Sequence, residues 1–556
     1  MARLAIAGAG IALVGITILR HELWRDELQA WQIARASHGF HSLVHNTRYE
    51  GHPLLWFGLL YPIAHAHAGP GAMQLLQFFI ASTTISVAVW RAPFTQLQKL
   101  LFVFGYFVLY EYGVLSRSYG LGAMCLVIAL ALAGTSAPRR WGPIGALLGL
   151  VALTSAFGAV VAIAVLAGLG VDEWLRRRDG GFAGASNGAV LLGGLLTFAG
   201  LATAYLQAAH PPSDTGNYSH WRTSLDVGLG ASSMASVWRA LVPIPSLERS
   251  YWNSNILSAR AAVVGVLGFA LFVLVAWILR DRPGSFVVWV SGVVLVVGFL
   301  YARIGTATAS RHIGHIFLCL VAAMWLAPFT WSRAPSSRHE APTRFSGFPI
   351  ARFITWSRAR SSRHEASTPL SDLTLTRSIT RSRARSSRHE ASPPSPDFTL
   401  TRSARAASVR SRWWTLLLFV QVIAGLFAVG LDLAYPFSNG RDVAQYIQRK
   451  GFDHFEIVGL PDTAASTVAG YLDRPIYYLT GSRTGTFVVW NTARNQVQPL
   501  EAVLRTQPPF ETGPPVLVLS NRPIDDPNVR LRLLVHFDNG IVGDEHYWLY
   551  LGEART

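Results

Sequence analysis

The chain has 556 residues, of which 51% are apolar and only 14% are charged, and its mean hydropathy is +0.31. A soluble protein carries about 25% charged residues, so this deficit excludes an ordinary soluble domain and favours an integral membrane protein. The net charge of +17 does not indicate nucleic-acid binding, because residues 332–412 alone hold 16 Arg against 5 acidic residues and lie between two apolar segments.

Apolar segments follow one another along most of the chain, and a bilayer core needs about 20 apolar residues per helix. The first segment lacks a signal-peptide cleavage pattern before its polar end, so we interpret it as a retained span. Cys125 and Cys319 lie inside such segments and are predicted to be buried free thiols. We predict about eleven transmembrane helices, near residues 3–20, 71–90, 100–115, 118–136, 143–157, 158–172, 185–207, 259–280, 284–302, 311–331 and 413–433.

The positive charges between the spans predict their orientation. Segment 53–68 is apolar but short and contains two prolines, so we place it at the membrane surface rather than across the membrane. With the N-terminus in the cytoplasm, five loops that carry Arg or Lys then also lie in the cytoplasm, as the positive-inside rule requires. In a bacterial-type plasma membrane, this topology leaves residues 21–70, the loop 208–258 and the tail 434–556 outside.

The cytoplasmic loop 332–412 contains an internal repeat of about 25 residues. The sequence SRAPSSRHEA begins at Ser332, and SRARSSRHEA begins at Ser357 and again at Ser382. The loop is rich in Ser, Arg and Pro, which predicts disorder. Contact with anionic lipids and a duplicated insertion without activity are both compatible with this composition.

The tail 434–556 has a different pattern from the transmembrane body 1–331 and the last span 413–433. Short apolar segments, among them FVVW at 487–490, alternate with helical patterns. Such alternation predicts a small extracytoplasmic α/β domain. The tail contains neither the GxGxxG motif nor the P-loop motif, which bind nucleotides.

The first external loop, residues 21–70, is dense in ionisable and aromatic side chains. Asp26 and Glu27 directly follow the first span, where carboxylates are costly unless they are paired or hydrated. They are therefore functional candidates, although acidic residues also decorate membrane interfaces without a function. The residues from Asp26 to Ala36 have helical spacing and predict a helix along the membrane surface. The histidines of the loop do not form a zinc motif, so we predict no zinc site and assign no metal ligands.

Two further motifs follow the Asp26-Glu27 pair on the same predicted side of the membrane. The segment EGHPLLW runs from Glu50 to Trp56, and the segment EYGVLSRSYGL runs from Glu111 to Leu121. Together with a span placed directly before the acidic pair, their order resembles the GT-C superfamily of membrane glycosyltransferases. The most similar group contains the polyprenyl- or dolichyl-phosphate-mannose–protein mannosyltransferases and the lipid A aminoarabinose transferases.

This resemblance covers roughly residues 1–135 by motif and the later spans by architecture only. It departs from the family where Leu54 and Ser118 each stand in place of a proline. It implies transfer of a sugar from a polyprenyl-phosphate-linked donor to an extracytoplasmic acceptor, which is a glycan, a lipid or a protein of the envelope. The implied partners are this lipid-linked donor and the membrane lipids.

The resemblance also implies roles for individual residues. Asp26 would be the general base, and Glu27 would orient the acceptor or a neighbouring group. No cofactor is certain, but some GT-C enzymes use a divalent cation at their carboxylates. The donor phosphate would be bound by Arg117, Arg311, His312 and Arg303. The substrate would be bound by Glu50, His52, Tyr119 and Glu111.

Two other classes of function also fit a body with many spans. A transporter or flippase is one, although we find no repeat of spans and no charges in the middle of the spans, which transporters usually have. A non-catalytic envelope assembly protein, whose tail binds partners, is the other.

Overall fold

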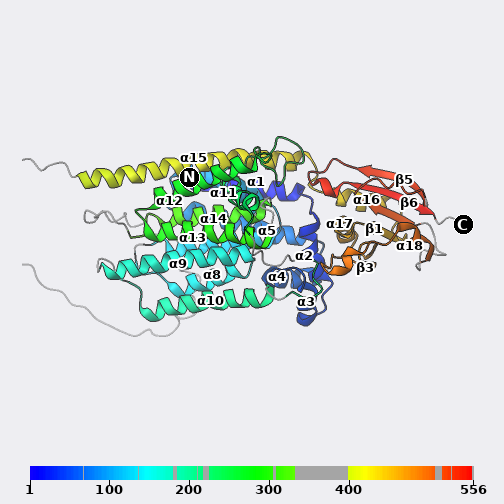
Figure 1. Cartoon of the computed structure of the whole chain (residues 1–556), viewed down its shortest axis with the longest axis horizontal. Coiled ribbons are helices and arrows are strands. Elements are labelled where there is room, and N and C mark those ends of the chain that lie inside the picture. The colour runs from blue at the N-terminus through cyan, green and yellow to red at the C-terminus, as the bar shows by residue number, and fades with distance from the viewer. Residues whose placement is uncertain are drawn as a thin grey trace, which may run out of the picture. The chain divides into compact units, whose positions relative to one another are not determined.

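The structure is a computed structural model that describes residues 1–66, 68–135, 137–179, 184–208, 211–216, 225–304, 309–331, 398–506, 516–527 and 529–553. Most of these residues form a helical bundle, and the C-terminal residues form a domain around a six-stranded sheet (Figure 1). The repeats in the loop 332–412, which we predicted to be disordered, lie outside the described residues. The last residues of this loop, from Phe398 onward, belong to a helix.

Seven helices among the described residues are long and apolar enough to cross a membrane. Large apolar side chains such as Leu19, Phe198 and Val266 are exposed on them, as expected for surfaces that face lipid. These helices indicate a membrane protein with several spans. They are α1 (Ala2–Arg20), α5 (Gly71–Arg91), α9 (Ala156–Arg178), α10 (Asn187–Ala208), α12 (Ala261–Leu279), α13 (Pro283–Phe299) with the π-helical turn η2 (Leu300–Ile304), and α15 (Phe398–Ala434).

The other four predicted spans are shorter or broken, so the predicted number of eleven is not confirmed. Helices α7 (Ser118–Ala133), α8 (Trp141–Ala152) and α14 (Ser310–Leu326) have 16, 12 and 17 residues. At about 1.5 Å per residue they extend over about 18–26 Å, less than the hydrocarbon core. The predicted span at 100–115 is divided into α6 (Gln96–Val103) and the π-helical turn η1 (Phe107–Glu111).

The predicted loop 208–258 contains a helix that we did not predict, α11 (Val227–Leu241), which packs along α12. Gly265 and Gly268 of α12 permit this close approach. A Cβ atom at Gly265 would lie 2.7 Å from the carbonyl oxygen of Ala231, and one at Gly268 would lie 2.3 Å from that of Met234. Small residues at such a crossing let two helix backbones touch, as in other membrane bundles.

The first external loop folds into α2 (Arg25–Arg35), α3 (Phe40–Thr47) and α4 (Leu55–His65). The predicted helix from Asp26 onward is confirmed as α2. The side chains from Glu27 to Ala34 are all buried, so this part of α2 contacts other parts of the protein rather than lipid. Helix α2 packs against both α4 and α17 (Asp462–Leu472), so it lies between the bundle and the C-terminal domain (Figure 1).

The C-terminal domain has a mixed sheet, which confirms the predicted α/β class. The strand order is β3-β2-β1-β4-β6-β5, in which β2, β1 and β4 are parallel and the others pair antiparallel. The strands are β1 (Ile457–Leu460), β2 (Ile476–Tyr478), β3 (Arg483–Gly485), β4 (Val516–Ser520), β5 (Arg530–Phe537) and β6 (Tyr547–Glu553). The domain's other helices are α16 (Gly440–Arg449) and α18 (Leu500–Thr506).

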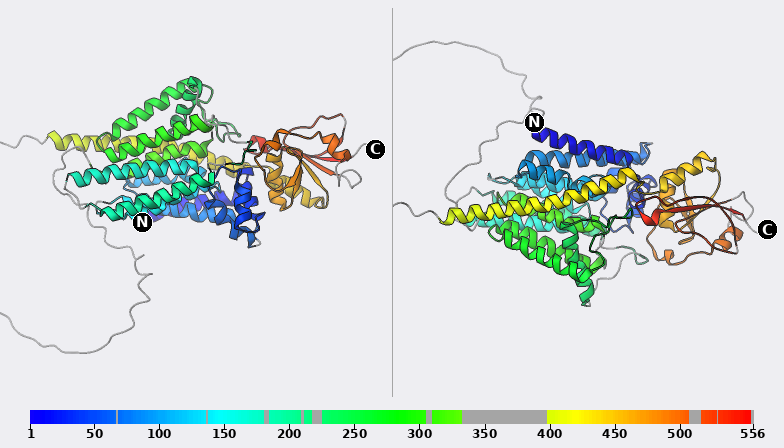
Figure 2. Two further views of the ribbon diagram at one scale, coloured as in Figure 1. Left: turned by 60° about the horizontal axis from the view of Figure 1, so that its bottom comes forward. Right: turned by 90° about the horizontal axis from the view of Figure 1, so that it is seen from above.

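Alternating strand residues build a core on each face of this sheet. Ile457 belongs to a cluster with residues of α16 and α17, whereas its neighbour Val458 belongs to a cluster with residues of α18. The segment FVVW at 487–490 is not a strand, contrary to the sequence prediction. The first residues of α1 and the C-terminal domain lie at opposite ends of the bundle (Figure 2).

Candidate active site

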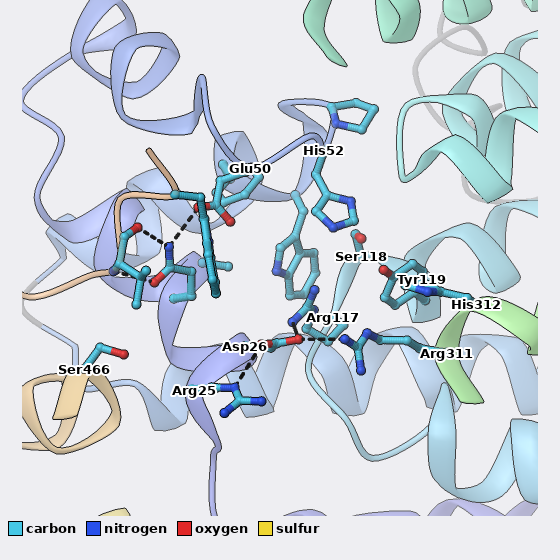
Figure 3. A pocket seen from close by; sticks show the side chains of 17 residues that line it. Arg25, Asp26, Glu50, His52, Arg117, Ser118, Tyr119, Arg311, His312 and Ser466 are labelled. Atoms are coloured by element: carbon cyan, nitrogen blue, oxygen red, sulfur yellow. Dashed lines mark hydrogen bonds and ion pairs between the residues drawn. The ribbon is translucent and has the colours of Figure 1, made fainter. Parts of the chain in front are cut away.

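A cavity of about 280 Å³ lies where the bundle, α2 and the C-terminal domain meet (Figure 3). The first turns of α2, α7 and α14 all reach it, together with the segment before α4. The C-terminal domain contributes the remaining wall. The lining residues are Arg25, Asp26, Gln29, Ala30, Glu50, His52, Pro53, Trp56, Phe57, Arg117, Ser118, Tyr119, Arg311, His312, Ser466, Val488 and Trp490.

Asp26 is the acidic centre of the cavity and is surrounded by three guanidinium groups (Figure 3). Its Oδ2 atom lies 3.0 Å from Nη1 of Arg117 and 3.2 Å from Nη2 of Arg311, and its Oδ1 atom lies 3.8 Å from Nε of Arg25. Burial alone would raise the pKa of Asp26, but the charges of Arg311, Arg117 and Arg25 outweigh it and hold the pKa below its usual value. Asp26 is therefore ionised at neutral pH.

The chain brings these charges together from three helix starts. Arg117 is the residue directly before α7, Arg311 is in the first turn of α14, and Asp26 is in the first turn of α2. A helix N-terminus carries a partial positive charge, so three such ends add to the positive potential around Asp26. The site is thus built to hold an anion.

Burial disfavours charged side chains in a second part of the cavity. Burial raises the pKa of Glu50 to about 7, and burial together with Arg117 and Arg311 lowers the pKa of His52 to about 3. His52 is therefore neutral at pH 7, and Glu50 is partly protonated.

Several polar atoms in the cavity wall have no hydrogen-bond partner among the described residues. They are Nδ1 of His52, Nε1 of Trp56, the hydroxyl of Tyr119 and Nε of Arg311. Trp56 and Tyr119 are each only 2% exposed, and a buried polar group without a partner is costly. Such groups are expected where a polar ligand completes the hydrogen bonding.

Gln29 connects the C-terminal domain to this site through hydrogen bonds. Its Nε2 atom donates to Oε1 of Glu50 (2.8 Å) and to the carbonyl oxygen of Val488 (2.7 Å). Its Oε1 atom accepts from the backbone N–H of Val488 (2.9 Å). One amide side chain therefore positions both Glu50 and the segment FVVW, and its hydrogen bonds take the place of those that a strand would make.

Glu27 does not line the cavity, although it neighbours Asp26 in the chain. It is fully buried, and its Oε2 atom lies 3.0 Å from Nε2 of His21, whose Nδ1 atom lies 2.8 Å from Oδ2 of Asp432 in α15. Its Oε1 atom accepts from the backbone N–H of Ser116 at 2.5 Å. Glu27 therefore holds in place the residue that precedes Arg117.

Three other residues that the sequence suggested as site residues differ in their position relative to the cavity. His312 lines the cavity and stacks on Phe157, with ring centroids 4.8 Å apart. Glu111 does not line it, because its carboxylate is buried and accepts from the hydroxyl of Tyr106 at 2.9 Å. Arg303 lies in η2 and does not line the cavity either.

The structure thus brings together most of the residues that the motifs singled out: Asp26, Glu50, His52, Arg117, Tyr119, Arg311 and His312. Five further lining residues were not among the predicted site residues: Arg25, Gln29, Trp56, Ser466 and Trp490. Gln29 was detectable, since it lies three residues after Asp26 and shares its helix face. Ser466 and Trp490 were not, because they reach the cavity only through the docking of the C-terminal domain.

A divalent cation does not fit this arrangement. The described residues contain no group of three or more His, Cys, Asp or Glu side chains that could hold a metal ion. The charges around Asp26 are guanidinium groups, which repel a cation and already occupy the carboxylate.

Comparison with models of protein families, with curated proteins and with solved structures found no match. The resemblance to GT-C glycosyltransferases therefore depends on the three motifs of the sequence and not on similarity along the whole chain.

Proposed function

We propose that this chain is a membrane glycosyltransferase that moves a sugar from polyprenyl phosphate to an extracytoplasmic acceptor. The observation that carries the proposal is the meeting of Asp26, Arg117 and Arg311 in one cavity. A carboxylate provides a proton acceptor, and a pair of guanidinium groups provides a site for a phosphate that gains charge as it leaves.

The proposed orientation places the cavity outside the cytoplasm. Helix α7 begins at the cavity with Ser118, so Arg139 follows its far end. Arg139 pairs with Asp172 near the end of α9, where Arg176, Arg177 and Arg178 also lie. Basic residues therefore collect at the end of the helices opposite the cavity, which supports a cytoplasmic assignment for that end.

The phosphate of the donor would bind between Arg117 and Arg311. Guanidinium groups bind phosphate through paired hydrogen bonds, and the Nε atom of Arg311 is free to make one. The phosphate would compete with Asp26 for these two cations. The polar wall formed by Glu50, His52, Trp56 and Tyr119 suits the hydroxyl groups of the donor sugar.

Binding of the donor would also change Asp26 from a weak base into a useful one. In the free site the arginines hold its pKa low, so the carboxylate attracts a proton poorly. The negative phosphate would offset part of their charge, and the pKa of Asp26 would rise. Asp26 would then take the acceptor proton while the acceptor oxygen or nitrogen bonds to C1 of the sugar and the bond from C1 to the phosphate oxygen breaks.

The first experiment measures transfer by the full chain in proteoliposomes. The donors are C55 polyprenyl phosphates that carry radiolabelled mannose, arabinose, galactose or glucose, and a cell-envelope extract supplies the acceptors. We expect the wild type to move the label and release polyprenyl phosphate. We expect Asp26→Asn to lose about 100-fold or more of the rate, as expected when a positioned base is removed.

The matched control is Asp473→Asn, which also removes an ion-paired carboxylate, but one that is 62% exposed and pairs with Arg35 away from the cavity. It should retain full activity. Full transfer by Asp26→Asn would refute the role of Asp26. Movement of intact lipid-linked sugar across the bilayer without cleavage would instead identify a flippase.

A further inference from the structure

The C-terminal domain supplies the wall of the cavity opposite the helix starts. Ser466 comes from α17, and Val488 and Trp490 come from the irregular segment between β3 and α18. Because this domain lies beyond the end of the apolar helices, the wall borders the aqueous side of the site (Figure 1). A water-soluble acceptor would approach the cavity along this wall.

Trp490 is held in a defined position at this wall. The guanidinium carbon of Arg494 lies 4.3 Å from the centroid of its ring. Arg494 is fixed in turn by two hydrogen bonds to the buried carboxylate of Asp462, at 2.8 and 3.0 Å. Arg494 covers one face of the indole, so a ligand in the cavity can stack only on the other face.

The backbone around Trp490 is already hydrogen-bonded. Gln29 occupies both backbone groups of Val488, and the carbonyl oxygen of Trp490 accepts from the N–H of Gly216 at 3.0 Å. The N–H of Thr492 donates to the carbonyl oxygen of Asp214 at 2.7 Å. An extended peptide that binds by adding a strand needs free backbone groups, and these hydrogen bonds leave few of them in this segment.

We infer that the acceptor is a carbohydrate, and that Trp490 stacks on its sugar ring beside the cavity. The apolar C–H face of a sugar matches an indole face, while its hydroxyl groups match nearby polar side chains such as Ser466 and Arg25. This inference rests on the proposed function, and it selects a glycan from the three classes of acceptor. Trp490 is then a residue that determines acceptor specificity.

The test is carried out with the full chain in nanodiscs. The rate of sugar transfer is measured at saturating polyprenyl-phosphate-linked donor. The carbohydrate acceptors are methyl glycosides of disaccharides of glucose, mannose, galactose or arabinose. A decapeptide that contains Ser and Thr represents a protein acceptor. Loss of one stacked ring predicts that Trp490→Ala raises the acceptor KM by about 10-fold. The donor KM should not change, and Trp490→Phe should restore most of the affinity.

Trp548→Ala is the matched control, since Trp548 is also half-buried in the C-terminal domain and stacks on a neighbour, His536, but lies outside the cavity. It should leave the acceptor KM unchanged. Saturation-transfer NMR with the same disaccharides measures binding without catalysis, and the signal should disappear in Trp490→Ala alone. Equal acceptor KM values in the two variants, or transfer only to the decapeptide, would overturn the inference. A wild type that binds disaccharides but never cleaves the donor would refute the proposed function instead.

Discussion

Asp26 faces more positive charge than it can neutralise. Arg117 and Arg311 both contact the same carboxylate oxygen, and Arg25 lies beside the other. Arg25 also pairs with Asp544, so its charge is shared with the C-terminal domain. The pair formed by Arg117 and Arg311 therefore leaves a surplus of about one charge for an incoming anion.

This surplus predicts different outcomes for Arg117 and Arg303, which the sequence analysis both assigned to the donor phosphate. Arg117→Ala would remove the proposed charge-assisted hydrogen bond to the donor phosphate, worth about 1.5–3 kcal/mol, and should raise the donor KM by about 10- to 100-fold. Arg303→Ala should leave the donor KM unchanged, because Arg303 does not line the cavity. Steady-state rates at varied donor concentration measure both values. Equal effects of the two substitutions would contradict the phosphate site.

At the scale of elements, a buried network of charged side chains joins three helices. His21 at the end of α1 contacts Glu27 of α2 and Asp432 of α15, and all three side chains are buried. Burial alone would lower the pKa of His21, but the carboxylates of Asp432 and Glu27 outweigh it and raise the pKa to about 10. The charged imidazolium of His21 therefore links the first turn of α2 to the last span, α15.

This network predicts that the protein loses stability in alkali. The folded pKa of His21 lies above its unfolded value of about 6.5, so its contribution is complete below pH about 6.5 and is lost as the pH rises through about 10. The thermal unfolding temperature of the full chain in nanodiscs should fall across this range, and the fall should be much smaller in His21→Gln. His454→Gln is the control, because His454 is exposed. The same pH dependence in wild type and His21→Gln would contradict the charged network.

Site residues that lie in local sequence motifs could be predicted from the sequence, whereas roles that depend on tertiary contacts could not. Asp26, His52 and Arg117 were found because each lies in a short motif beside the end of an apolar segment, and these motifs resemble those of GT-C enzymes. The role of Glu27 was not predictable, since its partners Ser116 and His21 become neighbours only after the helices pack.

The elements show the same division between local and tertiary information. The apolar segments and the strands of the tail follow from periodicity, which a single sequence displays. The segment FVVW has a strand-like composition, but Gln29 and the segment 214–216 take its backbone hydrogen bonds. Tertiary contacts thus overrode local propensity at the place where the C-terminal domain meets the cavity.

At the scale of the whole molecule, the cavity uses residues from both ends of the described chain but none between His312 and Ser466. Deletion of residues 340–389, which removes two repeat periods, should therefore leave the transfer rate unchanged in proteoliposomes of neutral lipid. If the Arg-rich repeats contact anionic lipid, the same deletion should reduce only the dependence of the rate on added anionic lipid. A large loss of activity in neutral lipid would show that the segment serves the site directly.

The clamp of Gln29 on Val488 joins two residues that are separated by 459 positions in the chain. During synthesis the first site residues leave the ribosome long before the segment that closes the cavity. The wall of the cavity is complete only when the last span has inserted and the terminal domain has folded against α2. A nascent or truncated polypeptide therefore lacks the wall that Ser466, Val488 and Trp490 provide. Under the proposed function, such a polypeptide should be inactive in sugar transfer until the terminal domain has folded.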